Sequence, residues 1–121
     1  MKTVLVADDE FDLAGTLQAI LQGEGYAAET CADGRAALEQ IKRTKPDLIL
    51  MDVMMPLMSG YDVLEEMKRT PGLDGIKVVL MSVAPIRLES GGSRGDVFLR
   101  KPFSLAAILK TVMELIGEPA P

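Results

Sequence analysis

Histidine is absent from this 121-residue chain, and cysteine occurs once, as Cys31. Without histidine there is no Ser-His-Asp or Cys-His catalytic machinery and no imidazole-based zinc site. A single cysteine excludes an internal disulfide and suits a reducing compartment, so we expect a cytoplasmic location. Whatever chemistry the chain carries must come from carboxylates, hydroxyls and amines.

Blocks of basic residues and long apolar runs are missing as well. The net charge is −5, which disfavours direct binding to nucleic acid or to an anionic membrane surface. Apolar stretches such as LILM and VVLM fall far short of the roughly 20 residues that a membrane span needs. The N-terminal MKTVLVADDE passes from a short apolar stretch straight into acids, unlike a signal peptide. We expect neither nucleic-acid binding nor membrane insertion.

Short apolar strands alternate with helical patterns along the chain. The expected strands are 2–7, 26–31, 47–51, 76–82 and 96–100, and the expected helices are 11–22, 34–43, 61–69 and 104–117. Asp33 and Ser104 are candidate helix N-caps, and Gly23 and Gly25 are stop signals for the first helix. A further helix belongs within 84–95, but Gly91-Gly92-Ser93 predicts that it is short or irregular.

This alternation predicts an α/β fold with a parallel sheet covered on both faces. We expect a single doubly wound five-stranded sheet in the flavodoxin-like order 2-1-3-4-5. Residues 1–117 form the predicted domain, and 118–121 form a C-terminal tail or the start of a linker.

Polar residues follow or close four of the predicted strands. Asp8-Asp9 follows KTVLVA, Asp52 follows DLILM, Ser82 closes KVVLM, and Lys101 follows DVFLR. Because the carboxyl ends of parallel strands form one edge of a sheet, these side chains are expected to meet there. An acid pair, a lone carboxylate, a hydroxyl and an ammonium are the parts of a magnesium-dependent phosphoryl-transfer site.

Each of these residues alone also has a purely structural interpretation. Asp8 or Asp9 can cap the following helix, and Asp52 can turn the chain. Ser82 can satisfy backbone groups at a turn, and Lys101 before Pro102 is commonly a solvated turn. The joint occurrence at four strand ends favours the phosphoryl-transfer interpretation.

Four stretches resemble the receiver domain of bacterial two-component response regulators, including the chemotaxis regulators, over essentially the full chain. They are VLVADDE, DLILMDVMMPLMSGYDVLEEMK, VVLMS and FLRKPFS. The resemblance implies that Asp52 accepts a phosphoryl group. It further implies that Mg²⁺ is held by Asp9, Asp52 and the backbone carbonyl of Met54, with Asp8 acting through water.

The same resemblance assigns Ser82 and Lys101 to the phosphoryl group, and Ser82 and Phe98 to the conformational switch. The implied phosphodonor is a sensor histidine kinase or a histidine phosphotransfer protein, and the output is an unknown protein target. The chain would be a phosphoacceptor that assists its own phosphoryl transfer and dephosphorylation, rather than an enzyme.

Two alternatives remain, and the sequence has one unusual residue at the site. A degenerate receiver would act as a constitutive interaction module. An aspartyl phosphatase resembling the haloacid dehalogenases would need a second Asp at the position of Met54, so we consider it less favoured. Receivers usually carry a small residue where this chain has Val83, which predicts slow hydrolysis and poor use of small phosphodonors.

Overall fold

The computed structural model describes residues 1–83 and 97–119. A five-stranded parallel sheet in the order β2-β1-β3-β4-β5 forms its centre, as predicted. The strands are β1 (Thr3–Ala7), β2 (Ala27–Cys31), β3 (Leu48–Asp52), β4 (Lys77–Ser82) and β5 (Val97–Arg100). The helices of the described residues are α1 (Phe11–Glu24), α2 (Gly34–Thr44), α3 (Gly60–Arg69) and α4 (Leu105–Ile116). The helix expected within 84–95 lies outside the described residues.

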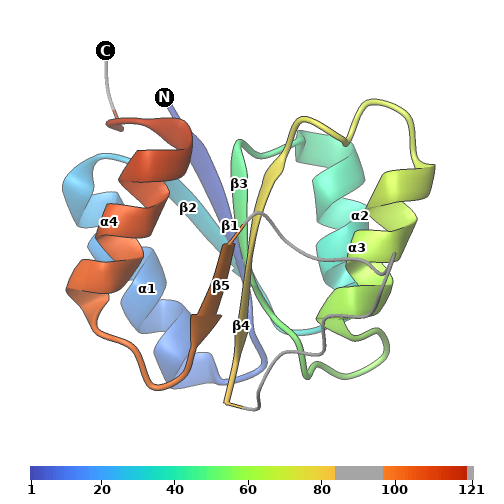
Figure 1. The fold of residues 1–121 in the computed structure, drawn as a ribbon, viewed down its shortest axis with the longest axis horizontal. Helices are drawn as coiled ribbons and strands as arrows, with labels where there is room; N and C mark the ends of the chain where they lie inside the picture. The colour runs from blue at the N-terminus through green and yellow to red at the C-terminus, as the bar shows by residue number, and fades with distance from the viewer. Residues whose placement is uncertain (84–96, 120–121) are drawn as a thin grey trace.

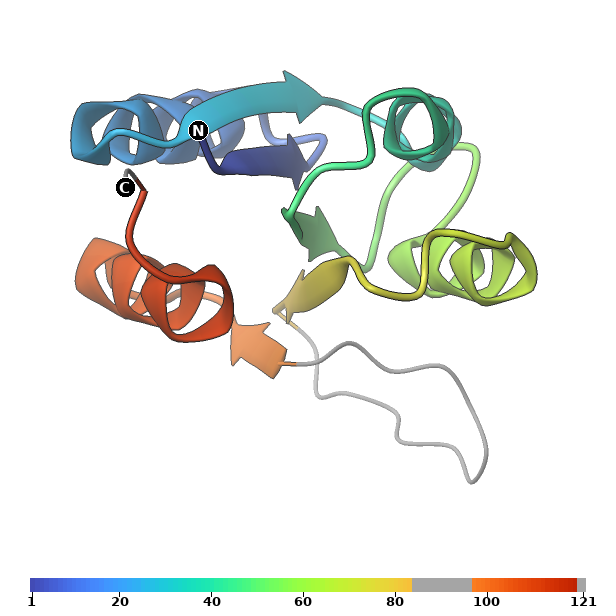
Figure 2. The same ribbon diagram turned by 90° about the horizontal axis from the view of Figure 1, so that it is seen from above.

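The helices cover the two faces of the sheet in pairs (Figure 1, Figure 2), with α1 and α4 on one face and α2 and α3 on the other. Successive residues of a strand point to opposite faces. In β3, for example, Leu48 and Leu50 join the core beneath α1 and α4, whereas Ile49 and Met51 join the core beneath α2 and α3. All five residues of β3 are buried, which explains the apolar run over 48–51 that precedes Asp52.

Two of the predicted caps are present, and one helix end differs from the prediction. The side chains of Asp33 and Ser104 accept hydrogen bonds from the backbone N–H groups of Ala36 and Ala107. Helix α1 continues past Gly23 and stops only at Gly25, whose φ of 106° is left-handed. A glycine is tolerated within a helix at a cost of about 1 kcal/mol, whereas a left-handed residue ends it.

The N-terminus and the end of α4 lie at the opposite end of the molecule from the carboxyl ends of the strands (Figure 1). Tyr26 donates a 2.7 Å hydrogen bond to the carbonyl of Gly117, which ties the end of α4 to the start of β2. Within the described part of the chain, no helix has the length and apolar character that crossing a membrane requires.

Candidate phosphoryl-transfer site

The predicted residues converge at the carboxyl edge of the sheet. Asp8 directly follows β1, Asp52 ends β3, Ser82 ends β4, and Lys101 directly follows β5. All four residues are buried, with exposed fractions between 1% and 8%. Asp8 and Lys101 are 93 positions apart in sequence, yet their side chains are in hydrogen-bond contact. The fold therefore brings together the strand-end residues that the sequence pattern singled out.

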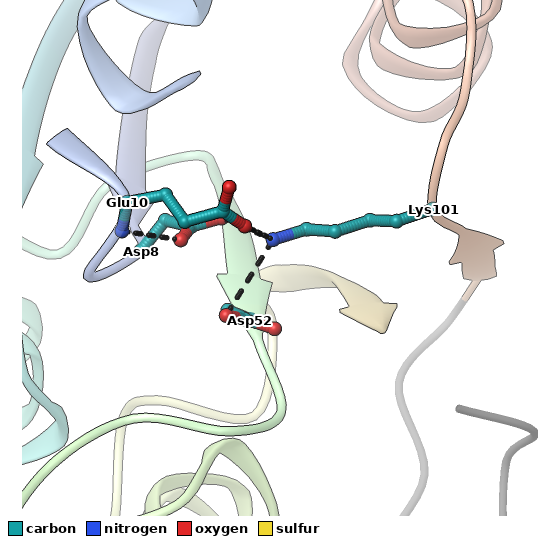
Figure 3. Close-up of polar contacts among 4 residues, drawn as sticks. All are labelled: Asp8, Glu10, Asp52 and Lys101. Atoms are coloured by element: carbon teal, nitrogen blue, oxygen red, sulfur yellow. Dashed lines mark hydrogen bonds and ion pairs between the residues drawn. The ribbon is translucent and has the colours of Figure 1, made fainter. Parts of the chain in front are cut away.

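The Lys101 ammonium lies among three carboxylates (Figure 3). Its Nζ is 2.8 Å from Asp8 Oδ2, 2.9 Å from Glu10 Oε1 and 3.5 Å from Asp52 Oδ2. The backbone fixes the start of this side chain, because the N–H of Lys101 donates to the carbonyl of Ser82 over 2.8 Å. The β5–α4 connection is therefore fixed to the end of β4.

Burial and neighbouring charges shift the pKa values of Asp52 and Lys101. Burial, reinforced by the charge of Asp8, raises the pKa of Asp52 to about 6, although Lys101 and the backbone N–H of Met54 favour its ionised form. Burial by itself would lower the pKa of Lys101, but hydrogen bonds to Asp8 and Glu10 and the charge of Asp52 raise it above its ordinary value. Lys101 is thus a permanent cation beside an acid that ionises close to neutrality.

The loop after β3 requires glycine next to the candidate acceptor. A Cβ on Gly60 would lie 2.7 Å from the carbonyl oxygen of Asp52, closer than packed atoms allow. The N–H of Gly60 donates to the carbonyl of Val53 over 2.8 Å, and Ser59 and Asp62 cap α3 reciprocally. This capping box fixes the start of α3 and, with it, the chain that leaves Asp52.

Carboxylate oxygens of Asp8, Glu10 and Asp52 lie within 4.8 Å of one another. A set of carboxylates at this spacing suits Mg²⁺, which prefers oxygen ligands. Asp9 is exposed and lies on the wall of a cavity of about 230 Å³ beside this cluster. The cavity is lined by Asp9, Glu10, Asp52, Met54, Ser82, Val83 and Lys101.

Sequence reasoning missed the contact between Glu10 and Lys101. The glutamate was visible only as the third acid of the DDE run, next to the start of a helix. The suggestion that Asp8 or Asp9 caps α1 is wrong, since the N-cap residue is Glu10 and its side chain makes no capping hydrogen bond. Asp8 instead accepts a 2.9 Å hydrogen bond from the N–H of Glu10.

The predicted switch aromatic and the unusual valine occupy different environments. Phe98 is paired in register with Leu80 of β4 and packs partly buried against the core beneath α2 and α3. Val83 is 66% exposed and lines the cavity beside Asp52.

Comparison with known proteins places these features in a family. The model of the response regulator receiver domain matches residues 4–113. The probable transcriptional regulatory protein TcrX of Mycobacterium tuberculosis is 35% identical over 115 residues, which cover 94% of this chain and 49% of TcrX. This chain spans about half the length of the curated relatives it matches.

Solved structures agree with this match. The chemotaxis response regulator CheY4 of Vibrio cholerae has a TM-score of 0.88 at 28% identity, covering 95% of this chain and 98% of CheY4. The response regulator TrrA of Thermotoga maritima, solved in complex with Mg²⁺-BeF, has a TM-score of 0.82 at 30% identity, covering 95% of this chain and 99% of TrrA. The chain therefore belongs to the response regulator receiver domain family of two-component signalling systems.

Proposed function

We propose that this receiver domain accepts a phosphoryl group onto Asp52 from a phosphohistidine of a partner protein. The observation that carries the proposal is the contact of one buried ammonium, that of Lys101, with the carboxylates of Asp8, Glu10 and Asp52. A sensor histidine kinase or a histidine phosphotransfer protein is the proposed donor, because this chain has no histidine of its own. We place the reaction in the cytoplasm and the domain at residues 1–117, with 118–121 as a C-terminal tail or the start of a linker.

The reaction is an in-line displacement at phosphorus. A carboxylate oxygen of Asp52 forms the new P–O bond while the P–N bond to the donor histidine breaks, and the histidine nitrogen leaves with the bonding pair. Lys101 neutralises charge on the phosphoryl oxygens, and the Ser82 hydroxyl donates a hydrogen bond to one of them.

We assign the Mg²⁺ site to Asp9, Asp52 and the backbone carbonyl of Met54, with Asp8 acting through water. Bound there, Mg²⁺ would supply charge neutralisation for the incoming phosphoryl group. The clustering of the Asp8 and Asp52 carboxylates supports this assignment, and Asp9 and Met54 line the cavity beside Asp52. The Mg²⁺-BeF complex of the relative TrrA supports it as well.

The aspartyl phosphate then acts as a switch. It adds negative charge and hydrogen-bond acceptors at the end of β4, and Ser82 moves toward them. We propose that Phe98, one strand away, repacks in response and changes the surface that meets an output protein. This is a shift between two populated states, and the phosphoryl group favours one of them. The receiver itself is proposed to act through protein contacts rather than nucleic acid.

Intact mass spectrometry tests the proposal directly. The wild-type chain is incubated with Mg²⁺ and either acetyl phosphate or a phosphorylated histidine kinase, beside an Asp52→Asn variant and an EDTA control. We expect a gain of one phosphoryl group in the wild type with Mg²⁺ and in neither control. A chain that stays unmodified with both donors would be a degenerate receiver, and the proposed function would be wrong.

A further inference from the structure

Glu10 occupies a helix N-cap position without capping the helix. N-cap side chains are usually short, because they must fold back onto the N–H groups of the first turn. Glu10 has the extended backbone of an N-cap but no side-chain hydrogen bond to α1. Its carboxylate instead lies 2.9 Å from the Lys101 ammonium, although the Glu10 side chain is 61% exposed.

Glu10 differs from the other two partners of Lys101. Asp8 and Asp52 are buried, and the proposed function uses both at the metal and phosphoryl sites. Glu10 is solvent-exposed and approaches Lys101 from the cavity that borders Asp52. Its N–H is held by Asp8, so the start of the Glu10 side chain is fixed relative to the cluster.

An ammonium has three N–H donors, and three carboxylates already surround this one. A phosphoryl group on Asp52 would bring more negative charge than Glu10 carries and would draw Lys101 toward itself. Glu10 would then lose its partner and would lie beside an anion of like charge. The phosphoryl group and Glu10 therefore compete for the Lys101 ammonium.

We propose that Glu10 is a positioning residue that holds the Lys101 ammonium in the unphosphorylated site and competes with the phosphoryl group for it. The inference rests on the proposed function of Asp52. It assigns Glu10 a part in setting how strongly the site retains a phosphoryl group, distinct from the roles of the proposed Mg²⁺ ligands and of the Asp52 nucleophile.

Two effects of opposite sign follow for Glu10→Gln. The variant releases Lys101 for the anion, so beryllofluoride, a phosphoryl mimic, should bind more tightly in saturating Mg²⁺. Because the ion pair that is lost is partly exposed, we expect the beryllofluoride affinity to increase only about threefold. Mg²⁺ alone should bind more weakly, because one of the three clustered carboxylates has lost its charge. A purely structural change at the start of α1 would not separate the two affinities in this way.

Asp12→Asn is the matched control. Asp12 is an exposed acid in the first turn of the same helix, so its removal changes the local charge equally. Among the contacts described for Lys101, the carboxylates are those of Asp8, Glu10 and Asp52, and Asp12 is not one of them. Glu10→Ala repeats the test without an amide that could accept a hydrogen bond from Lys101.

Calorimetric titration measures both affinities for the wild type and the three variants. The inference predicts tighter beryllofluoride binding and weaker Mg²⁺ binding for both Glu10 variants, beyond any change in Asp12→Asn. Beryllofluoride affinity equal to that of Asp12→Asn, or below that of the wild type, would overturn it while leaving the proposed function intact. A wild type that binds no beryllofluoride with Mg²⁺ would overturn the proposed function and this inference with it.

Discussion

At the scale of single residues, Val83 contacts two neighbouring cavities at the carboxyl edge of the sheet. It lines the cavity that contains Asp52 and a second one, of about 270 Å³, that is bounded by Leu13 and Phe103. The two cavities share Glu10, Val83 and Lys101 in their walls. Because Val83 lines the cavity that contains Asp52, we expect its branched side chain to narrow the approach to this candidate acceptor.

Replacing Val83 by alanine is expected to open that approach. Acetyl phosphate should then phosphorylate the chain faster, and the aspartyl phosphate should hydrolyse faster, since a small donor and a water molecule use the same opening. We expect each rate to increase about threefold to tenfold, which corresponds to lowering its activation free energy by up to about 1.4 kcal/mol. Time-resolved intact mass measures both.

Leu57→Ala is the control for this change. Leu57 is 71% exposed in the loop after β3, and it lines neither of the two cavities. Its removal should leave both rates unchanged. Equal rates in wild type and Val83→Ala would show that the valine does not limit access.

At the scale of elements, local patterns predicted more than contacts between distant segments. The apolar runs of β1, β3 and β4 identified the buried strands, and polar residues at the strand ends identified Asp8, Asp52 and Lys101 as neighbours. The contact between Glu10 and Lys101 spans 91 positions, and no local pattern encodes which way an exposed side chain turns. The end of α1 was misplaced for a separate reason. The left-handed φ of Gly25 stops the helix, and the presence of a glycine alone does not.

One contact between elements makes a sharp prediction about the loop that follows Asp52. A Cβ on Gly34, the first residue of α2, would lie 2.0 Å from the carbonyl oxygen of Met58. Gly34→Ala must therefore displace the β3–α3 loop or the start of α2. We expect a loss of roughly 1–3 kcal/mol in the free energy of unfolding, measured by urea denaturation.

Gly15→Ala, measured by the same urea denaturation, is expected to change the free energy of unfolding in the opposite direction. Gly15 lies inside α1, and a Cβ there would meet nothing within 4 Å. Alanine should raise the free energy of unfolding by up to about 1 kcal/mol, since it favours the helix over glycine. If both variants changed stability in the same direction, the close approach of α2 to the β3–α3 loop would not be the cause.

At the scale of the whole molecule, the buried carboxylates of the site lower the stability of the folded chain. Parallel strands collect Asp8 and Asp52 at one buried edge, where the Lys101 ammonium faces their carboxylates and that of Glu10 (Figure 3). Burial and the charge of Asp8 make the ionised form of Asp52 costly, which is why its pKa rises to about 6. An added cation would relieve this repulsion, so global stability should report on the site.

Without metal, ionisation of Asp52 should destabilise the chain as pH rises. In the unfolded chain Asp52 titrates near 3.8, whereas in the folded chain it titrates near 6. Between these values the folded state binds more protons, so the free energy of unfolding falls as pH increases. This shift corresponds to a loss on the order of 1–3 kcal/mol by pH 7.

Asp52→Asn should remove that loss. In EDTA the variant should be more stable than the wild type at pH 7, and the difference should disappear near pH 4. Mg²⁺ should raise the melting temperature of the wild type at pH 7 much more than that of the variant, since binding to the folded state stabilises it. Asp74→Asn, at an exposed acid after α3, controls for net charge and should show neither effect. Thermal unfolding between pH 4 and 7 measures the stability difference between Asp52→Asn and the wild type. A difference that stays constant with pH would mean that Asp52 does not carry a raised pKa.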